Sequence, residues 1–161
     1  MTTSTQDLAR IACIGIGATA AMDIWVLGLR RMGVPTLDMA MVGRWIGHIP
    51  RGRFAHAAIG RSEAVRGEGV LGWLTHYAVG IAFAALAVAV CGQGWLVRPT
   101  LLPALAVGLV TVAAPWFVMQ PAMGAGIAAS RTPTPWRNRL RSLANHGVFG
   151  LGLYVAAGVL R

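Results

Sequence analysis

The sequence predicts an all-α integral membrane protein, a four-helix transmembrane bundle with a long, Arg-rich first loop. Three observations predict this class: 56% of the residues are hydrophobic, 12% are charged, and four apolar runs are long enough to cross a bilayer. A chain of 161 residues has room for four such helices and one sizeable loop, so we expect a single transmembrane domain over residues 1–161. We place the helices at roughly 5–32, 70–91, 100–120 and 135–160, and the loop at 34–69.

The first expected helix carries signals at both ends. Ser4 is followed three residues later by Asp7, which is the spacing of a capping box. Gly33 and Pro35 mark the other end, because glycine closes a helix and proline cannot continue it. The apolar run continues to Leu29, which is too far for a cleaved secretory signal peptide. We therefore expect this helix to be a membrane span.

The loop that follows is the longest polar stretch of the chain. Leu37, Met41 and Trp45 recur at four-residue spacing and predict a short amphipathic helix in the membrane interface. A loop of this length is uncommon without a role, so we expect it to act as a gate over the cytoplasmic mouth of the bundle. The candidate gate residues are Arg44, His48 and His56.

The third apolar stretch contains three prolines and is expected to be irregular. Pro103 suits a first turn, Pro115 predicts a kink, and Pro121 predicts an end or a break. Thr134 and Pro135 then have the sequence of a helix cap and first turn, which starts the fourth span.

The distribution of Arg predicts the orientation. All fourteen basic residues are Arg: seven lie in or beside the first loop, four in the third, and three on the opposite side. The positive-inside rule therefore puts loops 34–69 and 121–141 in the cytoplasm and both termini outside. Basic residues beside apolar runs also favour membrane lipids with anionic headgroups as partners, and they argue against nucleic-acid binding.

Three of the expected helices place a polar side chain at a similar depth. Asp23, His76 and His146 lie five to eight residues from the nearest charged residue at the cytoplasmic side. At about 1.5 Å per residue, this is roughly 8 to 12 Å inside the boundary. Gln120 and Asn145 are placed to join them. Small residues recur every four positions on the same helix faces, which predicts that these polar groups point into the bundle.

A titratable group inside a membrane span is costly and usually functional. The polar layer therefore predicts a transporter or channel for a proton, a metal cation or a small solute, with Asp23 as the binding or relay group. The rival interpretation is a membrane-embedded metal- or haem-binding redox protein or enzyme, with His76 and His146 as ligands of a transition metal or haem. A third interpretation is a non-catalytic helper subunit in which the polar groups fix helix packing.

Two further expectations concern assembly and chemistry. A small bundle rich in Gly and Ala leaves close-packing faces unused, so we expect a homo-oligomer. The chain contains no HExxH and no CxxC pattern, and we therefore name no catalytic residue.

Five short strings of the sequence carry a family resemblance. They are Gly17–Asp23, Gly43–His48, Gly72–Tyr77, Gln120–Gly126 and His146–Tyr154. Together they resemble DUF2938, a family of small bacterial inner-membrane proteins, over nearly the whole chain. The resemblance implies four spans in a bacterial inner (cytoplasmic) membrane, and in such a membrane the distribution of Arg would put both termini in the periplasm. The family has no assigned activity, so the resemblance implies no catalytic residue.

Overall fold

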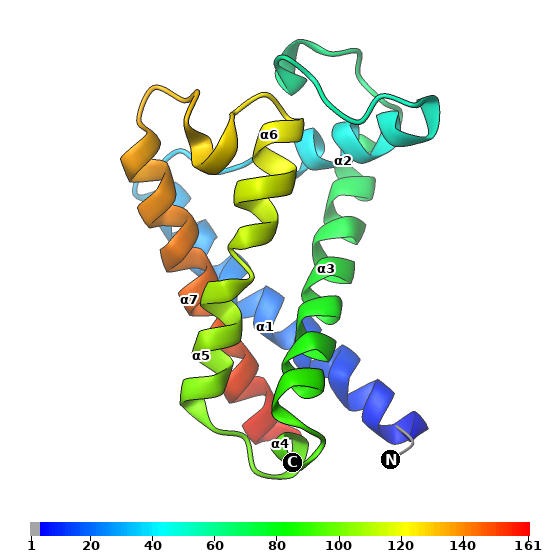
Figure 1. Ribbon diagram of the computed structural model, residues 1–161, viewed down its shortest axis with the longest axis vertical. Coiled ribbons are helices and arrows are strands. Elements are labelled where there is room, and N and C mark those ends of the chain that lie inside the picture. The colour runs from blue at the N-terminus through cyan, green and yellow to red at the C-terminus, as the bar shows by residue number, and fades with distance from the viewer. Residues whose placement is uncertain (1–3) are drawn as a thin grey trace. The chain divides into compact units, whose positions relative to one another are not determined.

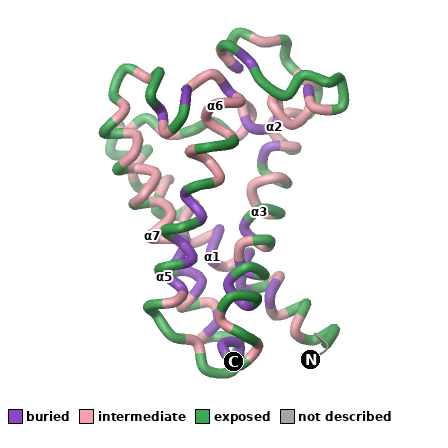
Figure 2. The backbone as a smooth tube through the Cα atoms, in the orientation of Figure 1, coloured by how far each residue is buried: buried purple, intermediate pink, exposed green. Residues whose placement is uncertain are grey.

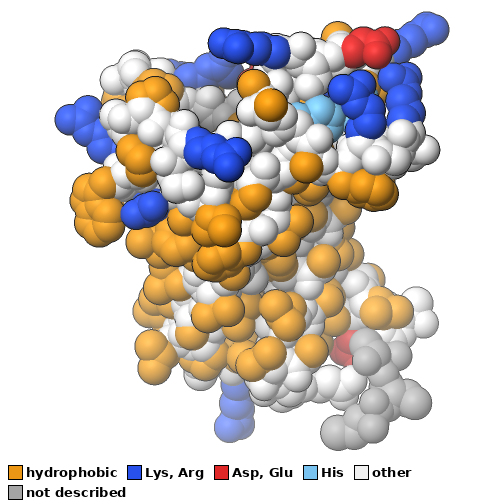
Figure 3. Space-filling model, turned by 45° about the horizontal axis from the view of Figure 1, so that its top comes forward, with side chains coloured by type: hydrophobic (Ala, Val, Ile, Leu, Met, Phe, Trp, Pro, Cys, Tyr) orange, Lys and Arg blue, Asp and Glu red, His pale blue; other side chains and the backbone are white. Residues whose placement is uncertain are grey.

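The computed structural model describes residues 4–161, and in this part of the chain it contains helices and loops but no strand. Four helical stretches are long and apolar enough to cross a membrane: Thr5–Arg31, Glu68–Cys91, Leu101–Ala122 and Pro135–Val159. The predicted all-α membrane fold is confirmed. Figure 3 shows hydrophobic side chains over much of the visible surface, as expected for helices that face lipid.

In chain order, the helices are α1 (Thr5–Arg31), α2 (Met39–His48), α3 (Glu68–Cys91), α4 (Gly94–Val97), α5 (Leu101–Val110), α6 (Gln120–Ala122) and α7 (Pro135–Val159) (Figure 1). Between them lie the short 3-10 turns η1 (Ile49–Arg51), η2 (Ile59–Arg61) and η4 (Ile127–Ala129), and the π-helical turn η3 (Pro115–Met119). The chain forms two compact units. Unit 1 contains the chain up to Val34 together with Tyr77–Thr111 and Leu143–Arg161, and unit 2 contains Pro35–His76 and Val112–Ser142.

Helix α1 begins and ends as the sequence predicts. The Ser4 hydroxyl accepts a 3.1 Å hydrogen bond from the Asp7 amide, and the Asp7 carboxylate accepts one of 3.1 Å from the Ser4 amide. These reciprocal bonds are the expected capping box. At the other end, Gly33 has a φ of 78°, which glycine adopts without strain and which turns the chain out of the helix before Pro35.

Within unit 1, helices α1, α5 and α7 pack with their backbones in close contact. A Cβ added at Gly108 of α5 would lie 2.6 Å from the Cα atom of Gly150 in α7. A Cβ added at Gly152 of α7 would lie 2.9 Å from the Cα atom of Ala18 in α1. Membrane helices use small residues in this way to approach closely. Buried residues lie along these three helices (Figure 2), among them Ile14 of α1, Ala104 of α5 and Leu153 of α7.

The third span is irregular, as expected, but it unwinds before the proline that was expected to kink it. Helix α5 gives way to a turn at Thr111 and Val112, and η3 begins at Pro115 (Figure 1). Proline has no N–H, and its ring crowds the carbonyl group four residues earlier, here that of Thr111. The effect of Pro115 therefore appears one turn before it. The span then ends at Ala122, directly after Pro121.

Within unit 2, the first loop is folded against the start of α3, and the short helix predicted in this loop is confirmed as α2. Gly43 of α2 meets the α3 backbone so closely that an added Cβ would overlap the carbonyl oxygen of Glu68. Beside this contact, the Arg44 guanidinium donates hydrogen bonds of 2.8 and 2.7 Å to the two carboxylate oxygens of Glu68. It donates a third, of 3.1 Å, to the carbonyl oxygen of Ser62. A bidentate pair of this kind fixes both side chains in one geometry.

The contact between α5 and α7 predicts a stability difference between two glycine substitutions. Gly108→Ala should destabilise the protein, because overpacking a filled site typically costs about 1–3 kcal/mol. Gly28→Ala in α1 is the matched control, since an added Cβ meets nothing within 4 Å there and alanine favours a helix over glycine by up to about 1 kcal/mol. Thermal unfolding in detergent should show a lower Tm for Gly108→Ala only. Equal Tm values for both variants would contradict the close helix contact.

A double-mutant cycle on Arg44 and Glu68 should show that the two side chains stabilise each other. We expect each change to Gln to lower the free energy of unfolding, and the double variant to lose less than the sum of the single losses. The Arg51–Glu63 pair is the control, because its N···O distance is 3.8 Å and its side chains are 56% and 71% exposed, against 12% and 18% for Arg44–Glu68. Chemical unfolding measures both couplings, and similar values would contradict a structural role specific to Arg44–Glu68.

Candidate functional site

Unit 1 holds the predicted intramembrane carboxylate against a phenol. The Tyr77 hydroxyl of α3 donates a hydrogen bond of 3.0 Å to Oδ2 of Asp23 in α1, and both side chains are half-buried. A phenol can donate to a carboxylate and can also accept from a protonated one, so this contact suits either protonation state of Asp23. Two spans far apart in sequence are thereby joined at a titratable group.

A second polar contact in unit 1 lies at the end of α5, where the third span unwinds. The Thr111 hydroxyl donates a hydrogen bond of 2.6 Å to the Gly108 carbonyl oxygen. Nδ1 of His146 in α7 lies 3.0 Å from the Thr111 hydroxyl oxygen and 3.2 Å from the same Gly108 oxygen. A carbonyl oxygen can only accept, so Nδ1 carries the proton in the neutral ring and Nε2 carries the lone pair. The break in the span thus fixes both the orientation and the tautomer of His146.

Two neighbouring side chains support this contact. Asn145 in α7 accepts a 3.0 Å hydrogen bond from the indole N–H of Trp25 in α1. Trp25 lies two residues after Asp23, so this bond joins the two helices close to the carboxylate. The ring of Phe83 in α3 lies with its centroid 6.4 Å from that of His146. We refer to these two contacts, Asp23–Tyr77 and Thr111–His146, together as the polar centre of unit 1.

Unit 2 contains a buried pair of histidines from the first loop. Nδ1 of His48, the last residue of α2, lies 2.8 Å from Nε2 of His56. The rings are stacked with centroids 4.9 Å apart, and the residues are 0% and 9% exposed. Arg44, the third predicted gate residue, is held in the ion pair with Glu68. Its hydrogen bonds to Glu68, opposed by desolvation, hold the pKa of Arg44 above its ordinary value.

The two remaining predicted residues also belong to unit 2. The ring of His76 in α3 meets Trp73 edge-on, with centroids 5.8 Å apart. Oε1 of Gln120 in α6 is buried and has no hydrogen-bond partner among residues 4–161. Of the five residues of the predicted layer, unit 1 contains Asp23, Asn145 and His146, and unit 2 contains His76 and Gln120.

In the described residues, 4–161, no group of three or more His, Cys, Asp or Glu side chains is arranged to hold a metal ion. Binding of a metal or haem by His76 and His146 therefore stays a prediction from the sequence.

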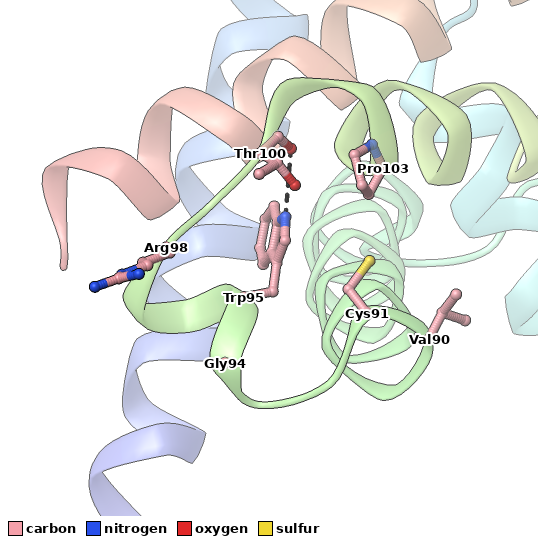
Figure 4. Close-up of a pocket in the computed structure, with 7 residues that line it drawn as sticks. All are labelled: Val90, Cys91, Gly94, Trp95, Arg98, Thr100 and Pro103. Atoms are coloured by element: carbon pink, nitrogen blue, oxygen red, sulfur yellow. Dashed lines mark hydrogen bonds between the residues drawn. The ribbon is translucent and has the colours of Figure 1, made fainter.

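A pocket of about 460 Å³ lies in unit 1 where α3 ends and α5 begins (Figure 4). Its lining residues are Val90, Cys91, Gly94, Trp95, Arg98, Thr100 and Pro103. The Trp95 indole donates a 3.3 Å hydrogen bond to the Thr100 carbonyl oxygen, so its N–H is used within the fold. Arg98, the charged residue of the lining, points away from Cys91 and Pro103 in Figure 4. The pocket therefore offers no convergent set of polar groups.

Several residues that hold the site together were not predicted from the sequence. Tyr77 directly follows His76, and because a helix turns by about 100° per residue, its side chain leaves the helix in a direction about 100° away from that of the predicted His76. Thr111 could have been identified from the sequence, because it lies four residues before Pro115. Proline has no N–H, so the Thr111 carbonyl group lacks the donor that it would have in a regular helix. The partnership of Arg44 with Glu68 has no signal in the sequence, because the two are brought together by the fold.

Comparison with known proteins agrees with the resemblance carried by the five strings. A family model described as a protein of unknown function, DUF2938, matches residues 12–160. No curated protein and no solved structure matches the chain. Because the family model covers almost the whole sequence, the chain belongs to the DUF2938 family.

Proposed function

We propose that the protein carries protons across the membrane through the polar centre of unit 1. The observation that supports this proposal most directly is Asp23, a carboxylate within an apolar span that is hydrogen-bonded at 3.0 Å by Tyr77 from a second span. A charge at membrane depth is costly, and membrane proteins retain such groups mainly along ion and proton pathways. A role in packing alone could be filled by neutral hydrogen-bonding side chains.

Each group of the centre can hold or transfer a proton at a defined atom. Asp23 takes a proton on a carboxylate oxygen, and Tyr77 donates to or accepts from that oxygen. His146 keeps one proton on Nδ1, against the Gly108 carbonyl oxygen, and can take up and release a second proton on Nε2. The Thr111 hydroxyl keeps the ring in place while this exchange occurs.

The irregular third span supports the same proposal. Pro115 provides no N–H for the carbonyl group of Thr111, and the chain there forms a turn. Non-helical backbone at membrane depth is tolerated where it is buried in protein or lines a water-filled cavity, and transporters use such breaks beside their binding sites. We further propose that the Arg-rich loops 34–69 and 121–141 face the cytoplasm, which would make transport run between that side and the exterior.

Proton flux into liposomes should depend on Asp23. With the purified protein reconstituted around a pH-sensitive dye and a membrane potential imposed, we expect wild-type protein to acidify the lumen faster than empty liposomes do. Asp23→Asn should reduce this flux roughly hundredfold, the lower end of what a positioned proton-transfer group contributes. Tyr77→Phe should reduce it less, because the carboxylate remains.

Asp38→Asn provides the matched control. Asp38 caps α2 by accepting a 2.9 Å hydrogen bond from the Ala40 amide, and asparagine caps equally well, so flux should be unchanged. Thermal unfolding of each variant separates lost transport from lost folding. Equal flux for Asp23→Asn and wild type would contradict the proposal, as would wild-type flux no faster than that of empty liposomes. Unfolding of Asp23→Asn, with no wild-type flux, would favour a packing role.

A further inference from the structure

We propose that His48 and His56 form a proton-sensitive latch that keeps the segment 53–61 docked within unit 2 at neutral pH and releases it in acid. This inference concerns unit 2 and does not depend on proton transport. It rests on the geometry of the buried pair, on the buried nitrogen atoms that have no partner, and on the main-chain bonds that the pair holds together.

The contact between the rings fits two neutral histidines. The 2.8 Å separation of Nδ1 of His48 from Nε2 of His56 is a hydrogen bond in which one nitrogen donates and the other accepts. If both rings carried two protons, two N–H groups would face each other across this distance. The bond would then be replaced by repulsion between two cations.

The other nitrogen of each ring is unsuited to a charge. Nε2 of His48 and Nδ1 of His56 are buried and have no hydrogen-bond partner among residues 4–161. A protonated histidine donates from both nitrogens, and a buried cationic donor without an acceptor is strongly unfavourable. Even one excess proton on the pair is therefore poorly accommodated in the docked state.

The surrounding charges do not offset this cost. The charged residues of the elements packed around the pair are Arg44 of α2, Arg51 and Arg53 after it, Arg61 of η2, and the acids Glu63 and Glu68. Glu68 is engaged by Arg44, and residues 112–130, which include the segment that receives the loop, carry no charge. The pKa of His48 is lowered, first by burial and then by the positive potential of His56, Arg53 and Arg51. The negative charge of Glu63 opposes this shift only in part.

The latch holds a defined set of contacts. The His56 amide donates a 2.8 Å hydrogen bond to the Ala122 carbonyl oxygen, and the Ile59 amide donates one of 3.1 Å to that of Met123. Ile59 and Met123 are 7% and 8% exposed, so they lose water when the segment docks. Gly124 lies so close to the Ala57 carbonyl oxygen that a side chain would not fit between them. Release would break these main-chain bonds together.

The direction of the pH effect follows from proton binding. A histidine whose pKa is lowered in the docked state binds more protons when released, so docking is most stable above the ordinary value of 6.5 and weakens as the pH falls below it. For each excess proton bound, the equilibrium constant for release rises up to about tenfold per pH unit.

Hydrogen exchange of the full-length protein in detergent tests this inference at the amides of His56 and Ile59. After correction for intrinsic exchange rates, their protection should be constant from about pH 8 to 6.5 and should then fall about tenfold per pH unit towards pH 5. The Gly92 amide, bonded to the Val88 carbonyl oxygen in unit 1, is the internal reference and should keep its protection. Unchanged protection of His56 and Ile59 across this range would overturn the proposal.

The double variant His48→Asn, His56→Gln is the matched control. The amide of asparagine replaces Nδ1 and that of glutamine replaces Nε2, so one hydrogen bond can persist without a titratable group. We expect protection at Ile59 that does not change with pH, and a fall equal to that of wild type would overturn the proposal. If the variant does not fold, the imidazole ¹⁵N chemical shifts of His48 and His56 in the wild type provide the test. We expect the two rings to become protonated over the same pH range in which the amides of the segment 53–61 lose protection. Protonated rings in a segment that keeps its full protection would refute the latch.

Discussion

Inside a bilayer there is no water to satisfy a polar group, so each polar group must find its partner within the protein. This constraint accounts for the contacts that organise unit 1. The Asp23 carboxylate is met by a phenol, and the carbonyl group of Gly108, near the end of a broken helix, is met by a hydroxyl and an imidazole. Glycine and alanine allow the helices to approach closely enough for such partners to reach one another.

The string Gly43–His48, which contributes to the family resemblance, has a structural explanation in unit 2. Five of its six residues hold the first loop in place. Gly43 lies against Glu68, Gly47 lies against Val65, and Arg44 forms the ion pair with Glu68. The Trp45 indole donates a hydrogen bond to the Phe54 carbonyl oxygen, and His48 forms a hydrogen bond with His56. A run of Gly, Arg, Trp and His in a membrane protein could be taken for a binding motif. Here, these residues form the framework that keeps a long polar loop folded, and the histidine pair is the part of it that can respond to solution conditions.

The sequence predicted the spans because length and apolar composition alone determine which segments can cross a bilayer. It also identified Asp23 and His146, since a polar residue stands out in an apolar run. It could not identify their partners: Tyr77 is an ordinary membrane residue until its neighbour is known, and Thr111 matters because Pro115 disrupts its helix. The division into two units was not predicted, because α3 and α7 run through both without any break in sequence pattern.

The turn at Thr111 also changes the electrostatic character of the third span. An unbroken helix over Leu101–Ala122 would have the negative end of its macrodipole at Ala122, whereas α5 ends at Val110 and so has a negative end of its own, equivalent to roughly half an elementary charge. The Gly108 carbonyl oxygen that contacts His146 belongs to that end. A cation beside the imidazole therefore meets an attractive field that is produced by the backbone and does not require an acidic side chain.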